Sequence, residues 1–94
     1  MAKPRESAAD LARAVAHLEQ RDWQAAHVIV QDDKSALAAW LHGIVHTLEG
    51  DLENARYWYR SARREFPGPE EVAAEIAQAR RALDHSAGST EEPA

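Results

Sequence analysis

The chain has 94 residues and no cysteine, so it has room for one domain and cannot form disulfides, thiolate nucleophiles or cysteine-bound metal sites. Its composition, 45 % hydrophobic and 29 % charged, is typical of soluble proteins, and its net charge of −5 argues against nucleic acid or anionic lipid as a partner. The N-terminal MAKPRESAAD lacks the apolar stretch of a signal peptide, and no apolar run approaches the roughly 20 residues of a membrane span. We therefore expect a cytoplasmic protein without a membrane partner.

Apolar residues three and four positions apart predict that the N-terminal third forms two helices. The first is expected from Ser7 to about Gln20. Asp22 follows a short break and is a good N-cap for the second helix, because its carboxylate can accept a hydrogen bond from a free backbone N–H. The inner side of this second helix carries Trp23, Ala26 and Val30.

A tight helical hairpin is predicted in the middle of the chain. The third helix has a broad apolar stripe and ends at Gly50, since glycine adopts the left-handed conformation after a helix at little cost. Asp51 can cap the fourth helix at once, so the two helices should be antiparallel. The spacing of Leu52 to Phe66 predicts the fourth helix, which we expect Pro67 to stop because a residue before proline avoids the helical conformation.

The segment Gly68-Pro69-Glu70-Glu71 is typical of a helix start, with proline in the first turn and acidic residues at the positive end. A fifth helix is therefore expected, with Leu83 near its end. The predicted fold class is all-α, with about five antiparallel helices. The predicted organisation is a flexible N-terminus over residues 1–6, a single helical domain over residues 7–84 and a disordered tail over residues 85–94.

The second half of the chain resembles the tetratricopeptide repeat. The residues that carry this resemblance are small, aromatic or proline, and they are Gly43, Gly50, Asp51, Ala55, Tyr59, Ala62 and Pro67. The resemblance implies degenerate helical hairpins with a C-terminal helix that caps the stack. Trp40 stands one position late for the repeat pattern, and the first unit is shorter than the usual length of roughly 34 residues.

The strings WQAAHVIVQDD and AAWLHGIVHTLEGDLENARYWYRSA resemble a group of small uncharacterised bacterial helical proteins. This second resemblance spans roughly Trp23 to Ala62. It implies a recurring stand-alone helical domain and no particular reaction. Thr47 stands where we expect a basic residue in that group.

Three histidines are the best candidates for chemistry. His42 and His46 are four residues apart and share a helix face, and His27 on the preceding helix can reach the same layer. We expect these side chains to lie together and to make local hydrogen bonds. The alternative is that they bind a divalent transition metal such as zinc, with a carboxylate completing the site; the acids within reach are Asp32, Asp33, Glu49 and Asp51.

No enzyme activity is expected. Gly43, Ile44 and Val45 separate the paired histidines, so the glutamate of the HExxH metalloprotease motif is missing. Ser35 and Ser61 lack the surroundings of a nucleophile elbow, and the chain has no glycine-rich phosphate loop. We therefore expect no catalytic residues and, apart from the alternative metal, no cofactor.

A small chain with three tryptophans cannot easily bury all of them, which predicts an apolar interaction surface. We expect that surface to contain residues of the third and fourth helices, namely Trp40, Leu41, Ile44, Tyr57 and Trp58. Its partner is expected to be another protein or a second copy of this chain, as a homodimer. The sequence therefore favours a small helical interaction or structural module, with the histidine-centred metal or small-ligand site as the alternative function.

Overall fold

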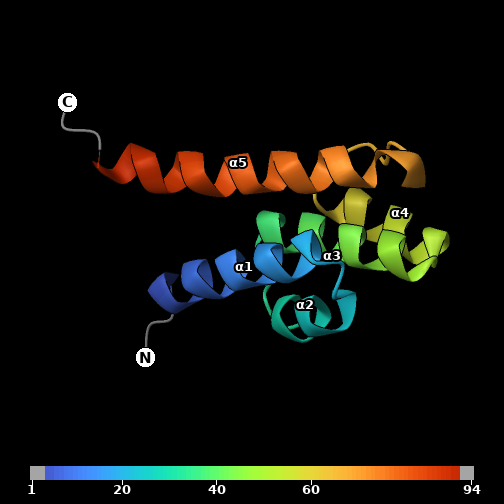
Figure 1. Ribbon diagram of the computed structural model, residues 1–94, viewed down its shortest axis with the longest axis horizontal. Coiled ribbons are helices and arrows are strands. Elements are labelled where there is room, and N and C mark those ends of the chain that lie inside the picture. The colour runs from blue at the N-terminus through green and yellow to red at the C-terminus, as the bar shows by residue number, and fades with distance from the viewer. Residues whose placement is uncertain (1–3, 92–94) are drawn as a thin grey trace.

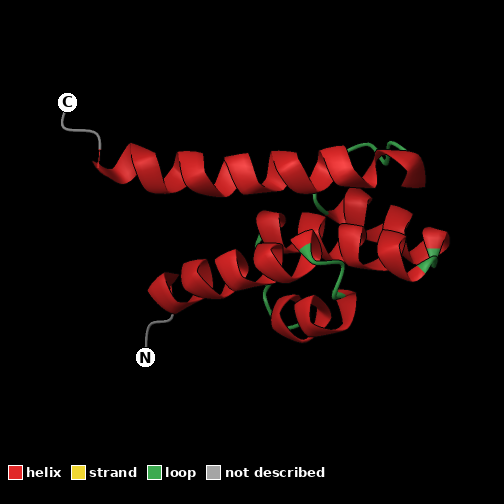
Figure 2. Cartoon of the chain, viewed as in Figure 1, coloured by secondary structure: helices red, strands yellow, loops and turns green. Residues whose placement is uncertain are grey.

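The computed structural model describes residues 4–91, and this part of the chain is all-α, as the sequence predicts (Figures 1 and 2). No strand occurs in it. One short 3₁₀ helix, Pro69–Glu71, precedes the last helix. The α-helices are α1 (Pro4–Glu19), α2 (Trp23–Val30), α3 (Ala36–Glu49), α4 (Leu52–Ser61) and α5 (Val72–Glu91).

Three helices begin where a side chain caps them. The carboxylate of Asp22 accepts a hydrogen bond from the N–H of Ala25 at the start of α2, and Asp51 caps α4 in the same way. The hydroxyl of Ser35 caps α3. These starts are fixed by residues next to the helix, which is why the sequence predicts the caps at Asp22 and Asp51.

The turn between α3 and α4 is the tight hairpin that the sequence predicts. Gly50 has a φ of +94°, and its N–H donates to the carbonyl oxygens of the last turn of α3. Farther along the hairpin, Gly43 lets the two helices approach closely. A Cβ atom at this position would lie only 2.5 Å from Cδ1 of Tyr59, so α3 and α4 can pack at this distance only with glycine here.

The fourth helix ends earlier than predicted. It stops at Ser61 because Arg63 adopts a left-handed conformation, with φ +63°, and the N–H of Arg64 donates to the carbonyl oxygen of Tyr59. Pro67 therefore does not set the end of the helix. The early exit lets Phe66 fold back onto α4, where its ring meets Tyr59 edge to face at 5.2 Å between centroids.

The two ends of the helical region also differ from the prediction. Helix α1 begins at Pro4, inside the segment 1–6 that was predicted to be flexible. Helix α5 continues to Glu91, so the predicted disordered tail from residue 85 is helical as far as that residue. Residues 1–3 and 92–94 lie outside the described residues.

Helix α3 lies at the centre of the fold. It packs against α1, α2, α4 and α5, and each of its residues from Ala38 to Thr47 is buried (Figure 1).

Among residues 4–91, no helix combines the length and the hydropathy that a membrane span requires. The all-α class is confirmed, whereas the resemblance of the helical hairpins to the tetratricopeptide repeat stays a prediction.

A buried carboxylate joins α5 to this centre. Oε1 of Glu75 accepts one hydrogen bond from Nε1 of Trp40, at 3.0 Å, and another from the hydroxyl of Tyr59, at 2.8 Å. Burial, together with the negative charge of Glu75, raises the pKa of Tyr59, so this hydroxyl stays protonated and donates. The guanidinium of Arg64 lies 3.4 Å from the centre of the Trp40 ring and covers it from outside.

Candidate metal centre

The structure brings His27, His42 and His46 together. His27 projects from α2, whereas His42 and His46 lie one turn apart on α3. The ring centroids are 4.8 Å apart for His27 and His42, 5.0 Å for His42 and His46, and 5.5 Å for His27 and His46. One ring nitrogen from each residue lies within 4.8 Å of the other two, so the three side chains form one cluster.

The cluster is largely enclosed by the protein. His42 and His46 are buried, and His27 is partly buried. The indole of Trp58, from α4, stacks on the ring of His42 at 3.9 Å with an interplanar angle of 7°. Trp58 therefore covers one side of the cluster with an apolar surface, which strengthens electrostatic and coordinate interactions inside it.

His46 is held in place by a carboxylate. Its Nδ1 lies 2.7 Å from Oε1 of Glu49, three residues farther along α3. This contact engages Nδ1 of His46 and leaves its Nε2 without a hydrogen bond to a described residue. A carboxylate that accepts a hydrogen bond from one nitrogen of a histidine is the usual support for a metal ligand, because it fixes the tautomer and makes the other nitrogen more basic.

The other two rings have no such support. Toward residues 8–85, whose side chains the structure describes, the side chains of His27 and His42 contact other rings but make no hydrogen bond. Among these residues no buried side-chain nitrogen or oxygen lacks a partner, so the ring nitrogens of His27 and His42 must be in contact with solvent. The predicted local hydrogen bonding therefore holds for His46 alone.

The surroundings keep His42 neutral at pH 7. Burial, together with the nearby rings of His46 and His27, lowers the pKa of His42 from 6.5 to about 4. A neutral imidazole has a free lone pair, which is the form that binds a metal ion. His42 is therefore ready to act as a ligand without first losing a proton.

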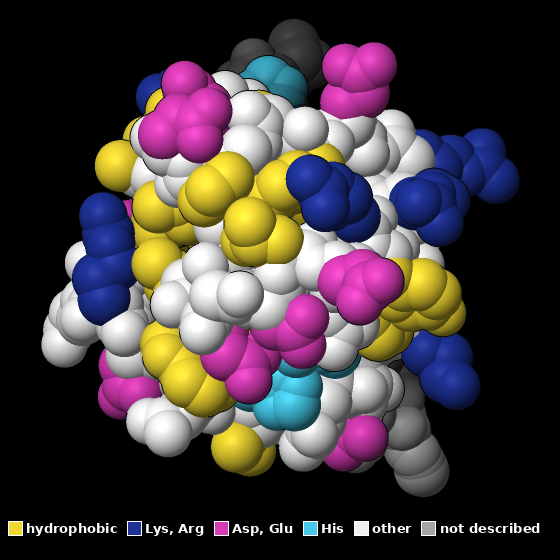
Figure 3. Space-filling model, turned by 90° about the vertical axis from the view of Figure 1, so that its right-hand side faces the viewer, with side chains coloured by type: hydrophobic (Ala, Val, Ile, Leu, Met, Phe, Trp, Pro, Cys, Tyr) yellow, Lys and Arg dark blue, Asp and Glu magenta, His cyan; other side chains and the backbone are white. Residues whose placement is uncertain are grey.

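Acidic side chains lie at the open edge of the cluster. Glu49 and Asp51 are exposed, and together with His46 they offer a second set of ligand atoms within 4.8 Å of one another. Figure 3 shows histidine side chains reaching the surface beside Asp and Glu side chains. Asp32 and Asp33, the other acids considered from the sequence, belong to neither candidate set among the described residues.

The predicted interaction surface is wrong for three of its five residues. Trp40, Leu41 and Ile44 lie in the core, because α5 covers this side of α3 and supplies Glu75 as an acceptor for the Trp40 indole. Tyr57 is 54 % exposed, and Trp58 is partly buried between Tyr57 and the histidines. What remains at the surface is therefore one tyrosine and the edge of one tryptophan.

Sequence reasoning missed Glu75. The signal was available, because Glu75 lies three residues after Val72 and one before Ile76, inside the apolar stripe of the last helix. An acid in such a stripe must find a hydrogen-bond donor when the helix packs. The donors, Trp40 and Tyr59, are 35 and 16 residues away, which no local pattern reveals.

Compared with known proteins, the chain matches no protein-family model, no curated protein and no solved structure. Both resemblances drawn from the sequence therefore stay predictions. The function has to follow from the side chains of the site.

Proposed function

We propose that the protein binds one divalent transition-metal ion through His27, His42 and His46. The observation that supports this most strongly is the convergence of three ring nitrogens within 4.8 Å of one another. A metal at about 2.0 to 2.1 Å from each nitrogen in tetrahedral geometry needs nitrogens roughly 3.3 Å apart. Rotation of the three side chains would have to close that difference for one ion to contact all three rings.

The chemistry of the ligands favours zinc. Imidazole nitrogens suit zinc, copper, nickel and iron, and the fully nitrogenous set of three histidines with no thiolate is one that zinc commonly accepts. Three protein ligands leave one tetrahedral position open at the solvent edge of the cluster. Water or another small ligand would occupy that position.

Metal binding would also join two helices. The ligands come from α2 and α3, so the ion would link a short helix of eight residues to the central helix of the fold. The unfolded chain has no preformed site, so metal binding would raise the free energy of unfolding. Once the metal concentration exceeds the dissociation constant, this increase would grow with the logarithm of the ratio of the two.

The interaction module predicted from the sequence is the weaker proposal. Its tryptophan anchor Trp40 and the neighbouring Leu41 and Ile44 are inside the chain. A partner would have to bind mainly through Tyr57 and Trp58. The metal proposal, in contrast, uses all three residues that the sequence suggested for it.

Calorimetric titration of zinc into protein purified without a histidine tag and stripped with a chelator tests the proposal. The wild type should bind one ion per chain, and His42→Ala and His46→Ala should each lower the affinity at least about 100-fold. His85→Ala is the matched control, because His85 is exposed on α5 outside the cluster. Equal, weak binding by all four proteins would contradict the proposal.

A further inference from the structure

His42 has no hydrogen bond that could orient its ring, unlike His46. Glu49 holds His46 through Nδ1 at 2.7 Å, whereas the side chain of His42 makes no hydrogen bond to any residue whose side chain the structure describes. A histidine that binds a metal normally uses its second ring nitrogen for such a bond, because the bond fixes the orientation of the ring. A different contact must therefore fix the ring of His42 if it is to act as a ligand.

Aromatic rings supply that contact. The indole of Trp58 stacks on the ring of His42, with 3.9 Å between the centroids and an interplanar angle of 7°. The ring of His46 is stacked on His42 at 5.0 Å and 21°, and the rings of His27 and His42 meet edge to face at 4.8 Å. Rotation of the His42 ring about χ2 would break its parallel stack on the indole, so Trp58 favours one orientation of that ring.

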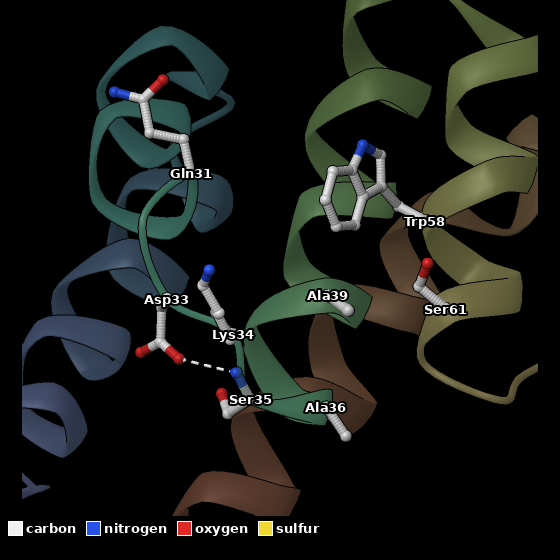
Figure 4. Close-up of a pocket in the computed structure, with 8 residues that line it drawn as sticks. All are labelled: Gln31, Asp33, Lys34, Ser35, Ala36, Ala39, Trp58 and Ser61. Atoms are coloured by element: carbon white, nitrogen blue, oxygen red, sulfur yellow. Dashed lines mark hydrogen bonds between the residues drawn. The ribbon is translucent and has the colours of Figure 1, made fainter.

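Trp58 lies on a helix that carries none of the three histidines. Figure 4 shows its indole reaching from α4 toward α3, where it also lines a pocket of about 430 Å³. No histidine is among the described residues that line this pocket, so the indole separates it from the cluster. Because open space adjoins Trp58, a smaller side chain here should cost less stability than the truncation of a tryptophan packed on all sides.

The stack also favours the metal-bound form of His42. A coordinated metal ion draws electron density from an imidazole and makes the ring more positive. The face of an indole attracts positive charge within about 6 Å of its centroid, and does so more strongly than the face of phenylalanine or tyrosine. The 3.9 Å contact lies inside that distance. The stack is therefore stronger with the ion bound than without it, and this difference adds to the metal affinity.

We propose that Trp58 is a positioning residue of the metal centre, which orients His42 by face stacking as Glu49 orients His46 by a hydrogen bond. Trp58 supplies no ligand atom. It would couple α4 to a site whose ligands lie on α2 and α3. The proposal rests on metal binding by the three histidines.

Calorimetric titration of zinc into Trp58→Phe and Trp58→Leu tests this role. Phenylalanine keeps a flat ring against His42 and should lower zinc affinity by less than about threefold. Leucine removes the stack and should lower zinc affinity about tenfold or more, the loss expected when the support of a metal ligand is removed. Trp58→Met, whose longer side chain fills more of the space, takes the place of Trp58→Leu if that variant does not fold.

The visible spectrum of the cobalt(II)-loaded proteins is the second readout, because it reports the geometry of the ligands around the ion. Trp58→Phe should keep the spectrum of the wild type, and Trp58→Leu should change it. Phe66→Leu is the matched control, because the ring of Phe66 meets Tyr59 and not the histidines. This control should lower the free energy of unfolding without changing zinc affinity or the cobalt spectrum.

The two proposals fail in different ways. If the wild type binds zinc and Trp58→Leu binds it equally tightly, the positioning role is excluded and the metal site stands. A loss in Trp58→Phe as large as that in Trp58→Leu would also overturn it, as would a weaker affinity with an unchanged cobalt spectrum. If the wild type does not bind zinc, the metal proposal fails first, and the role of Trp58 fails with it.

Discussion

Two polar clusters contact the central helix α3, and they differ in how their hydrogen bonds are satisfied. Around Glu75, one carboxylate oxygen accepts from both Trp40 and Tyr59, so each donor has an acceptor. Among the three histidines, only His46 has a hydrogen-bond partner within the described chain. A buried polar group that is fully satisfied specifies how helices pack, whereas ring nitrogens that lie close together and have no hydrogen-bond partner among the described residues are available to a ligand.

The energetic consequence of this difference is a division of roles. The three imidazoles make only one hydrogen bond to described residues, that of His46 with Glu49, so we expect the histidine cluster to add little to the stability of the metal-free fold. The Glu75 cluster holds three helices together. Substitutions in the Glu75 cluster should therefore lower stability and leave zinc affinity largely unchanged. Substitutions in the histidine cluster should lower zinc affinity and leave the stability of the metal-free protein largely unchanged.

Removal of the Glu75 carboxylate should have the largest effect on stability. Glu75→Ala leaves the Trp40 N–H and the Tyr59 O–H buried without an acceptor, and we expect a loss of about 3 kcal/mol in the free energy of unfolding. Urea denaturation measures this loss. Glu75→Gln keeps a carbonyl acceptor and should lose less, and both variants that remain folded should bind zinc like the wild type. A loss below about 1 kcal/mol in Glu75→Ala would refute the structural role of this cluster.

A methyl group at Gly43 tests the packing that lies between the two clusters. Gly43→Ala would place Cβ within 2.5 Å of a Tyr59 ring carbon, so the tyrosine or the helix must move. We expect a net loss of about 2 kcal/mol, because overpacking outweighs the better helix propensity of alanine. Thermal or urea unfolding measures it. An increase in stability would mean that α3 and α4 are not in such close contact.

Acid should weaken the metal-free fold through His42. Its pKa is lowered to about 4 in the folded protein from an ordinary value of 6.5, so the unfolded chain binds the proton more readily. The stabilising contribution is complete above about pH 6.5 and is lost progressively as the pH falls toward 4. Urea unfolding from pH 7 to pH 4, with His42→Ala for comparison, measures this slope. An identical pH dependence in both proteins would show that His42 titrates normally.

Removal of the Glu49 charge that supports His46 should have the smallest effect on stability. Glu49→Gln removes the negative charge next to Nδ1 of His46 and should lower zinc affinity about tenfold. Because Glu49 is exposed, the free energy of unfolding without metal should change by less than about 0.5 kcal/mol. Glu53→Gln is a matched control on α4. Unchanged zinc affinity in Glu49→Gln would indicate that this carboxylate does not support a metal ligand.

The sequence predicted those parts of the fold that depend on neighbouring residues. The caps at Asp22 and Asp51 and the left-handed Gly50 follow from short-range hydrogen bonds and backbone preferences, and they are confirmed. The proximity of His27 to His42 follows because two consecutive helices pack as an antiparallel pair.

The parts that were wrong depend on contacts between distant residues. Trp40 is buried because Glu75, 35 residues later, offers an acceptor and α5 covers it. The early end of α4 depends on a left-handed conformation at Arg63, which arginine seldom adopts and which no local pattern indicates. Neither feature could be obtained from the spacing of apolar residues.

The most direct test of the metal centre is anomalous diffraction at the zinc absorption edge from crystals grown with one equivalent of zinc. We predict one strong peak per chain between α2 and α3, at about 2.0 to 2.1 Å from a ring nitrogen of each of His27, His42 and His46. The absence of a peak there, or zinc bound only to the exposed carboxylates of Glu49 and Asp51, would contradict the proposed three-histidine site.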